Sequence, residues 1–207
     1  AGQKIELAKE AARATAEALG HEDRIGVIAF EQHARLVVPI QRAGNRYRIA
    51  TRIGSISPSG GTMIYPALQL AFTELERVRA KVKHIILLSD GDAPTNGIDA
   101  LVRQMRRSGI TVTAVGVGTG ANRGMLESIA ERGGGRSYFT DRPETLPRIF
   151  VRETREIAGE TVVERRVRAK LAPGVGRIDL LRGVDLAGLP PLRGFLTSKT
   201  RAGAEEI

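Results

Sequence analysis

The chain has 207 residues, of which 42% are hydrophobic and 27% charged, as in ordinary globular proteins. This length accommodates one α/β domain and an appendage, and the lack of cysteine excludes a disulfide scaffold and thiolate chemistry. The formal net charge is +9, but the basic residues are dispersed, which argues against nucleic acid as a partner. No apolar run reaches the roughly 18 residues that a membrane span needs, so we expect no span in this piece.

The predicted elements alternate between helices and strands along most of the chain. The first is a helix over residues 3–19, where Ile5, Ala8 and Ala12 recur at helical spacing. The others follow in this order: strand 25–30, strand 35–38 closed by Pro39, helix 45–53, loop 55–61, helix 66–79, strand 84–88, helix 98–108, strand 110–117, helix 122–131, strand 137–140 and helix 144–153. This alternation predicts an α/β fold with a doubly wound, mostly parallel sheet and helices on both faces.

The pattern changes after about residue 155. Apolar and polar residues alternate between Val163 and Leu171, residues 172–192 are rich in glycine and proline, and Phe195–Thr197 has the composition of a strand. We therefore expect a first domain over residues 1–155. Residues 156–207 are expected to form a β-rich extension or the start of a following module.

Two loops rich in side-chain oxygens are candidates for a binding site. Ser59-Gly-Gly-Thr62 leads into a helix, and Ser89-Asp-Gly-Asp92 follows the most apolar strand. In an open parallel sheet ligands bind beyond the carboxyl ends of the strands, and Mg²⁺ prefers hydroxyl, carboxylate and water oxygens. The alternative is that these residues are ordinary turn and helix-capping residues, and spacing alone does not decide between the two.

Five segments resemble a von Willebrand factor A (vWA) domain, in the order in which that family has them. They are Lys4–Ala11, Asp23–Phe30, Gly60–Leu68, Ile85–Gly91 and Val115–Gly118. The resemblance implies a Rossmann-like fold over roughly residues 2–152 and a non-enzymatic protein-interaction module of bacterial type.

The resemblance also implies a metal-ion-dependent adhesion site (MIDAS). In the family, a threonine and an aspartate at the positions of Thr62 and Asp90 help to hold Mg²⁺, whose open position accepts a carboxylate from a partner protein. Ser59 and Ser89 would support them with their hydroxyls. Asp92 would either support the site as well or serve only as a turn residue, and its place after the strand favours the turn. Residues 156–207, with Leu189–Phe195 as their best motif, resemble the segment that follows such a domain in some bacterial envelope proteins, so the parent protein is expected to be envelope-associated or membrane-anchored.

One part of the family's pattern has no counterpart in this sequence. An Asp-x-Ser-x-Ser motif normally ends the central first strand, whereas Ser55–Ser59 has the serines without the aspartate. We therefore expect a truncated domain in which Mg²⁺ binding is weak or absent. Something should fill the place between strands 25–30 and 84–88, because an open slot would leave backbone groups unpaired. The candidates are residues outside this sequence, a segment from a neighbouring copy, or collapse of the two flanking strands onto each other.

A second reading is a nucleotide-binding enzyme domain. Gly116, Gly118 and Ala121 follow a strand and open a helix, and Asp141 lies twenty residues further on, as in the loose dinucleotide fingerprint. A third reading is a purely structural vWA domain without a competent metal site. The remaining candidates are weaker: Tyr65 is expected to pack or to line a ligand surface, and His84 is expected at a surface or strand edge.

Overall fold

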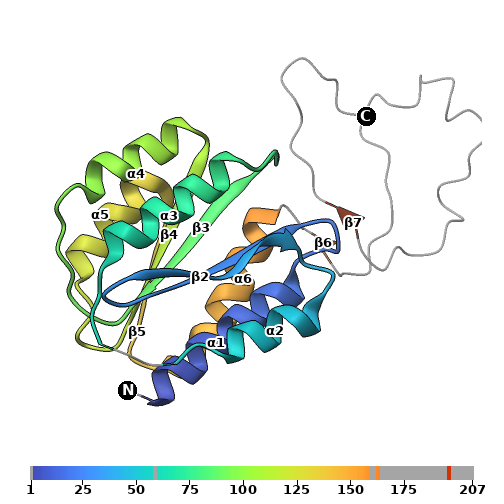
Figure 1. Ribbon diagram of the computed structural model, residues 1–207, viewed down its shortest axis with the longest axis horizontal. Helices are drawn as coiled ribbons and strands as arrows, with labels where there is room; N and C mark the ends of the chain where they lie inside the picture. Colours follow the sequence, from blue (N-terminus) through green and yellow to red (C-terminus); the bar gives the residue numbers. More distant parts are fainter. Residues whose placement is uncertain (1, 58–59, 159–161, 164–194, 197–207) are drawn as a thin grey trace, which may run out of the picture. The chain divides into compact units, whose positions relative to one another are not determined.

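The computed structural model describes residues 2–57, 60–158, 162–163 and 195–196 (Figure 1). The chain divides into two compact units, Ala1–Ala158 and Gly159–Ile207. In the second unit, strand β6 (Val162–Val163) pairs antiparallel with β7 (Phe195–Leu196). The alternating segment 163–171 lies outside the described residues except for Val163. The motif Leu189–Phe195 likewise lies outside them except for Phe195. The envelope location inferred from that segment therefore stays a prediction.

The first unit is built on a three-stranded parallel sheet in the order β3-β4-β5. Strands β3 (Lys83–Ser89), β4 (Ile110–Val117) and β5 (Gly134–Thr140) are joined by α4 (Ile98–Arg107) and α5 (Arg123–Gly133). These two crossovers are the strand–helix alternation that the sequence predicts. All three strands therefore end at the same edge of the sheet, which is where the candidate site was expected.

Helices cover both faces of this sheet, so the α/β prediction is confirmed (Figure 1). Helix α3 (Ile64–Glu76) packs with α4 and α5 on one face. On the other face lie α1 (Gly2–Ala18) and α6 (Leu146–Ala158), which follows a short 3₁₀ turn, η1 (Pro143–Thr145). Among the described helices, none is both long and apolar enough to cross a membrane.

A separate hairpin forms the rest of the unit. Strand β1 (Arg24–Phe30) pairs antiparallel with β2 (Ala34–Arg42), and the pair packs on α1 and on α2 (Arg46–Gly54). The predicted end of the second strand at Pro39 is wrong, because β2 continues for three more residues. Pro39 is exposed, and the register of β2 shifts where it pairs with Ile25–Ile28 of β1. Such an irregular edge strand tolerates proline, which has no N–H to donate to a neighbouring strand.

Strands β1 and β3 do not pair with each other. In the described part of the chain, β1 pairs with β2 and β3 pairs with β4, each along one edge. Of the three candidates for filling the place between these strands, collapse of the two flanking strands onto each other is therefore wrong. The apolar side chains Ile85, Ile86 and Leu88 of β3 are only half-buried, whereas nearly all of β4 is buried.

A buried carboxylate joins α6 to the sheet. Glu153 is fully buried and accepts hydrogen bonds from the hydroxyls of Thr113 (2.7 Å) and Tyr138 (2.8 Å). The guanidinium of Arg136 donates to both of its carboxylate oxygens, at 3.2 and 3.1 Å. Burial would raise the pKa of Glu153, but these hydrogen bonds and the positive charge outweigh it and lower that pKa. Burial and the bond to Glu153 raise the pKa of Tyr138 to about 12, so its hydroxyl stays a donor.

His84 lies beside this carboxylate on β3, and its imidazole is almost fully buried. Its Nε2 lies 3.5 Å from Glu153 Oε1 and has no hydrogen-bond partner among the described residues, while Nδ1 lies 2.6 Å from Thr111 Oγ1. The expectation of a surface or strand-edge histidine is therefore half right, since β3 is an edge strand but the ring is inside. Burial lowers the pKa of His84 to about 4, although the charge of Glu153 opposes this.

We expect the stability of the first unit to fall as the pH drops from 6.5 toward 4. The unfolded chain takes up a proton on His84 near pH 6.5, whereas the folded chain takes it up only near pH 4. The free energy of unfolding should therefore decrease by up to about 3 kcal/mol across this window. Urea unfolding at pH 7.0 and 4.5 measures it. His84→Gln should reduce this dependence of the free energy of unfolding on pH, whereas His21→Gln, at an exposed histidine, should leave it unchanged. If both variants showed the same dependence on pH, the assignment to His84 would be contradicted.

Candidate functional site

Thr62 and Asp90 meet at the carboxyl end of the sheet. Asp90 directly follows β3, and Thr62 lies two residues before α3. A methyl group placed on Gly91 would lie 3.3 Å from the Thr62 hydroxyl oxygen, so that hydroxyl sits against the Asp90–Gly91 turn. The Thr62 loop is anchored by the N–H of Met63, which donates to the carbonyl of Glu31 at 2.8 Å. The structure thus brings the Thr62 hydroxyl against the turn that carries Asp90, although the two segments are distant in the sequence.

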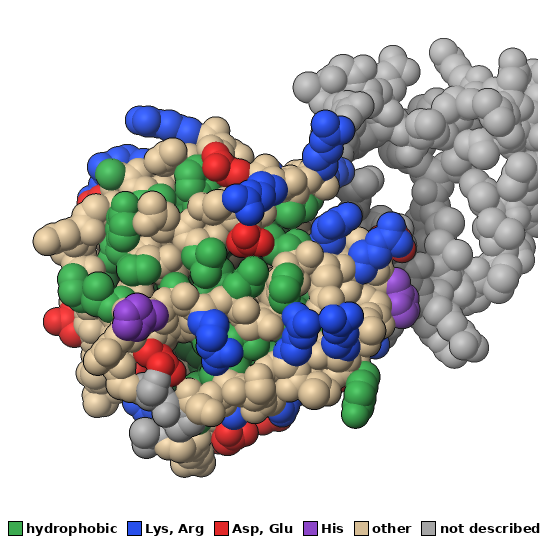
Figure 2. All heavy atoms as spheres, in the orientation of Figure 1, with side chains coloured by type: hydrophobic (Ala, Val, Ile, Leu, Met, Phe, Trp, Pro, Cys, Tyr) green, Lys and Arg blue, Asp and Glu red, His purple; other side chains and the backbone are tan. Residues whose placement is uncertain are grey.

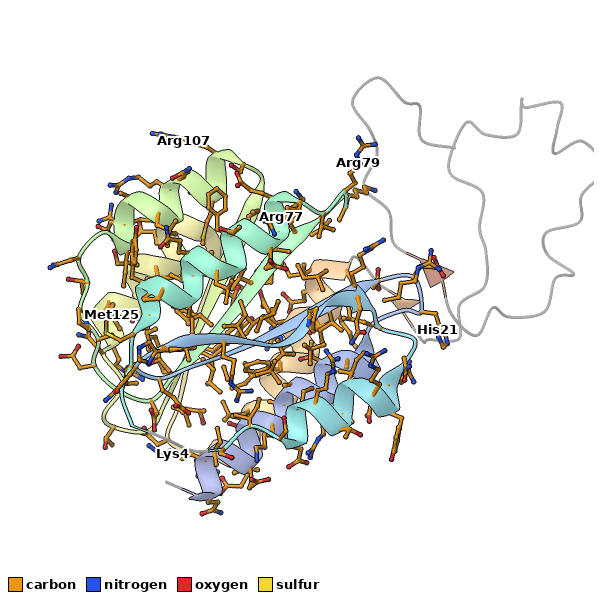
Figure 3. All side chains as sticks on the ribbon, viewed as in Figure 1. Lys4, His21, Arg77, Arg79, Arg107 and Met125 are labelled. Atoms are coloured by element: carbon orange, nitrogen blue, oxygen red, sulfur yellow. The ribbon has the colours of Figure 1, made fainter. Side chains whose placement is uncertain are left out.

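Lys4 adds a positive charge to this place. Its Nζ lies 3.3 Å from Asp90 Oδ2, and the two side chains are 39% and 54% exposed. A methyl group on Gly118 would lie 3.0 Å from the same Nζ, so the ammonium reaches across to the end of β4. Figure 3 shows Lys4 on the first turn of α1, near the end of the molecule toward which β3 runs.

Sequence reasoning did not single out Lys4. A usable signal existed, because a lysine in the first turn of a helix faces the positive end of the helix dipole. The first turn of α1 holds no acidic residue that would offset this charge. A lysine in this position is stabilised by a carboxylate from elsewhere in the fold, and the structure places Asp90 in contact with Lys4.

The three supporting residues differ in what they do. Ser89 is buried, and its hydroxyl donates to the carbonyl of Gly91 at 3.4 Å, within its own turn. Asp92 accepts a hydrogen bond from the Asn122 amide at 2.7 Å, and Asn122 in turn caps α5 by accepting from the N–H of Met125. Asp92 therefore joins two loops of the rim. Ser59 lies outside the described residues.

The glycines of the nucleotide reading have structural roles. A side chain on Gly116 would lie 2.7 Å from the ring of Phe139, so a glycine lets that ring pack on β4. Gly118 has a φ of +79° and donates its N–H to the carbonyl of Thr140 at 2.8 Å. Ala121 is half-buried against the core, and Asp141 is exposed after β5. These contacts account for the pattern without a bound nucleotide.

Tyr65 packs instead of lining the rim. A methyl group on Gly97, whose φ is +79°, would lie 2.9 Å from the ring of Tyr65. Tyr65 also packs against the hydrophobic cluster that α3, α4 and α5 form with the parallel sheet. On the face that Figure 2 shows, Lys and Arg side chains lie among hydrophobic and acidic ones.

Comparison with known families decides the class of the first unit. The sequence model of the von Willebrand factor type A domain matches residues 1–152, about three quarters of the chain. The chain belongs to this family.

Relatives of this vWA domain agree with the assignment. An uncharacterized protein from Synechocystis is 28% identical over 210 residues, which cover all of this chain and 49% of that protein. The solved von Willebrand factor type A structure from Catenulispora acidiphila is 26% identical, with a TM-score of 0.66 over 75% of this chain and 38% of that one. The chain thus spans about half, or less, of the length of these two proteins.

A third structure concerns the site itself. Proximal thread matrix protein 1 from the mussel byssus was solved with a zinc-occupied MIDAS motif; it is 20% identical, with a TM-score of 0.62 over 72% of this chain and 40% of that one. At this identity the likeness shows the fold alone. In this vWA domain, the described residues hold no cluster of three or more His, Cys, Asp or Glu side chains that suits a metal.

The donor chemistry of the rim nevertheless suits a hard cation. Thr62 and Asp90 offer hydroxyl and carboxylate oxygens, which are the ligand types that Mg²⁺ takes. The Asp90 carboxylate already has a positive neighbour in this structure, the ammonium of Lys4. The type of donor therefore fits a divalent ion, but two donors leave most of an octahedral shell to other oxygens.

Proposed function

We propose that the vWA domain of this chain is a non-enzymatic protein-interaction module. It holds a divalent cation, Mg²⁺ by preference, at Thr62 and Asp90, and through it binds a carboxylate of a partner protein. The observation that supports this most is that the Thr62 hydroxyl lies against the turn that carries Asp90, just after the carboxyl end of β3. Membership of the vWA family adds to it.

The two side chains have different tasks in this proposal. The Thr62 hydroxyl ligates the cation when the partner is bound, and Asp90 ligates it directly or through water. The bound cation supplies an open coordination position for the partner's carboxylate. Since these side chains bring one negative charge, we expect the chain to bind Mg²⁺ weakly by itself and more tightly when a partner supplies further oxygens.

Paramagnetic broadening by Mn²⁺ tests the site even at weak affinity. We expect submillimolar Mn²⁺ to broaden the amide signals of residues 60–62, 90–91 and 118–120 of the purified protein first, because these segments surround the proposed ion. Diamagnetic Mg²⁺ should reverse the effect by competition. Broadening that is uniform over the surface, or that is centred on another acidic residue such as Asp141, would contradict the proposed function.

The open edges of β1 and β3 support a second part of the proposal. Each strand is paired along one edge within the described part of the chain, and the apolar residues of β3 are half-buried. We propose that a further β-segment, from a neighbouring copy or from another stretch of polypeptide, pairs with these edges, since unpaired buried backbone groups are costly. Slow amide hydrogen exchange along both edges would support this, and fast exchange would contradict it.

A further inference from the structure

The ammonium of Lys4 occupies a place at the proposed cation site. Its ammonium contacts Asp90, the carboxylate that the proposed function assigns to the metal, at 3.3 Å. The same nitrogen lies close to Gly118, on the other rim loop. An ammonium and a divalent ion both carry positive charge, so they repel each other when they share one carboxylate.

The surroundings of the Lys4 ammonium suit a positive charge that can come and go. Gly118 leaves room for it, because a methyl group there would lie 3.0 Å from Nζ. Lys4 starts from the first turn of α1, whose dipole and lack of acidic residues favour an anionic neighbour. Both partners are part-exposed, so the lysine can leave the carboxylate without unfolding anything and an ion can reach it from solvent.

We propose that Lys4 is a tethered competitor of the divalent cation, so that the affinity of the site is set by exchange between the Lys4 ammonium and the metal on Asp90. This inference rests on the proposed function. With Lys4 on Asp90 the site is closed to metal. With metal on Asp90 the lysine is displaced into solvent, where its ammonium is free to meet the carboxylate of a partner.

The test compares Mn²⁺ affinity between charge-matched variants, measured by the electron paramagnetic resonance signal of free Mn²⁺. We expect Lys4→Met to bind Mn²⁺ about three- to tenfold more tightly than the unchanged protein, since it removes both the competing ion pair and the repulsion. Lys4→Arg should remain close to the unchanged protein. Lys81→Met, which removes the same charge at an exposed position before β3, should also leave the affinity unchanged.

A second readout follows the lysine instead of the metal. Added Mg²⁺ should increase the rate at which a limiting acetylating reagent modifies Lys4, measured by mass spectrometry, because the displaced amine is no longer held by Asp90. The rate at Lys81 should not change. Asp90→Asn should raise the Lys4 rate without any metal.

The outcomes separate this inference from the proposed function. Equal Mn²⁺ affinity in Lys4→Met and the unchanged protein, together with a loss of binding in Asp90→Asn, would overturn the role of Lys4 and leave the metal site standing. An equal gain in Mn²⁺ affinity in Lys4→Met and Lys81→Met would show that the effect comes from net charge alone, and would also overturn the role of Lys4. Failure of every variant, Lys4→Met included, to bind Mn²⁺ near Asp90 would reject both.

Discussion

Replacing Glu153 by alanine is expected to lower the melting temperature of the first unit by about 10 °C. The change leaves Thr113, Tyr138 and the charge of Arg136 without their shared acceptor, inside a contact between α6 and the sheet. Breaking a buried, hydrogen-bonded charge pair costs about 3–5 kcal/mol, and each kcal/mol corresponds to about 2–4 °C in a domain of this size. Differential scanning calorimetry at pH 7 measures the shift.

Glu156→Ala is the matched control for this prediction. Glu156 lies on the same helix and contacts the same Arg136 at 2.9 Å, but its side chain is 34% exposed. A part-exposed ion pair of this kind contributes at most about 1 kcal/mol. We therefore expect a shift of a few degrees at most. Equal shifts in Glu153→Ala and Glu156→Ala would mean that the buried network does not hold α6 to the sheet.

Asp90→Ala is expected to weaken divalent-cation binding by more than about 100-fold, since loss of even an outer contact of a metal site costs 10–100-fold. Asp90 lies in the turn against which the Thr62 hydroxyl sits, and it is the acidic residue that the proposal assigns to the ion. Mg²⁺-dependent capture of any partner protein should be lost with it. Mn²⁺ titration measures the change in affinity.

Asp141→Ala controls for the loss of one negative charge, because Asp141 is exposed after β5 and the metal proposal gives it no role. Its Mn²⁺ affinity should match that of the unchanged protein. The nucleotide reading makes the opposite prediction. If Asp141→Ala weakened ligand binding and Asp90→Ala did not, the site would have to be placed beyond β4 and β5 instead.

The order of elements and the rim of the sheet are readable from the sequence. The strand predicted at residues 110–117 has the bounds of β4, and nearly all of β4 is buried because helices cover both faces of the sheet. The proximity of Thr62 and Asp90 follows from the fold, since Asp90 comes directly after β3 and Thr62 lies two residues before α3, which starts at the same edge of the sheet. Local pattern and topology suffice for both.

Features that depend on tertiary contacts are not readable in the same way. Three successive glycines, Gly133–Gly135, have the composition of a turn, yet the first ends α5 and the other two begin β5. Only the packing explains the last glycine, because a side chain on Gly135 would overlap the carbonyl of Val112. The sequence alone suggests that Glu153 is a surface residue of an amphipathic helix. Its hydrogen-bond partners Thr113 and Arg136 lie 40 and 17 residues away in the chain, so only the fold reveals that it is buried among them.

The central claim is that the rim formed by Thr62 and Asp90 is a cation site. Anomalous difference density from a crystal of the protein soaked in millimolar Mn²⁺ tests it most directly, because it locates the ion itself. The account predicts a peak between the Thr62 hydroxyl and the Asp90 carboxylate, with the Lys4 ammonium moved away. A map with no peak there and Lys4 still on Asp90 at saturating Mn²⁺, or with the ion bound at another carboxylate, would contradict it.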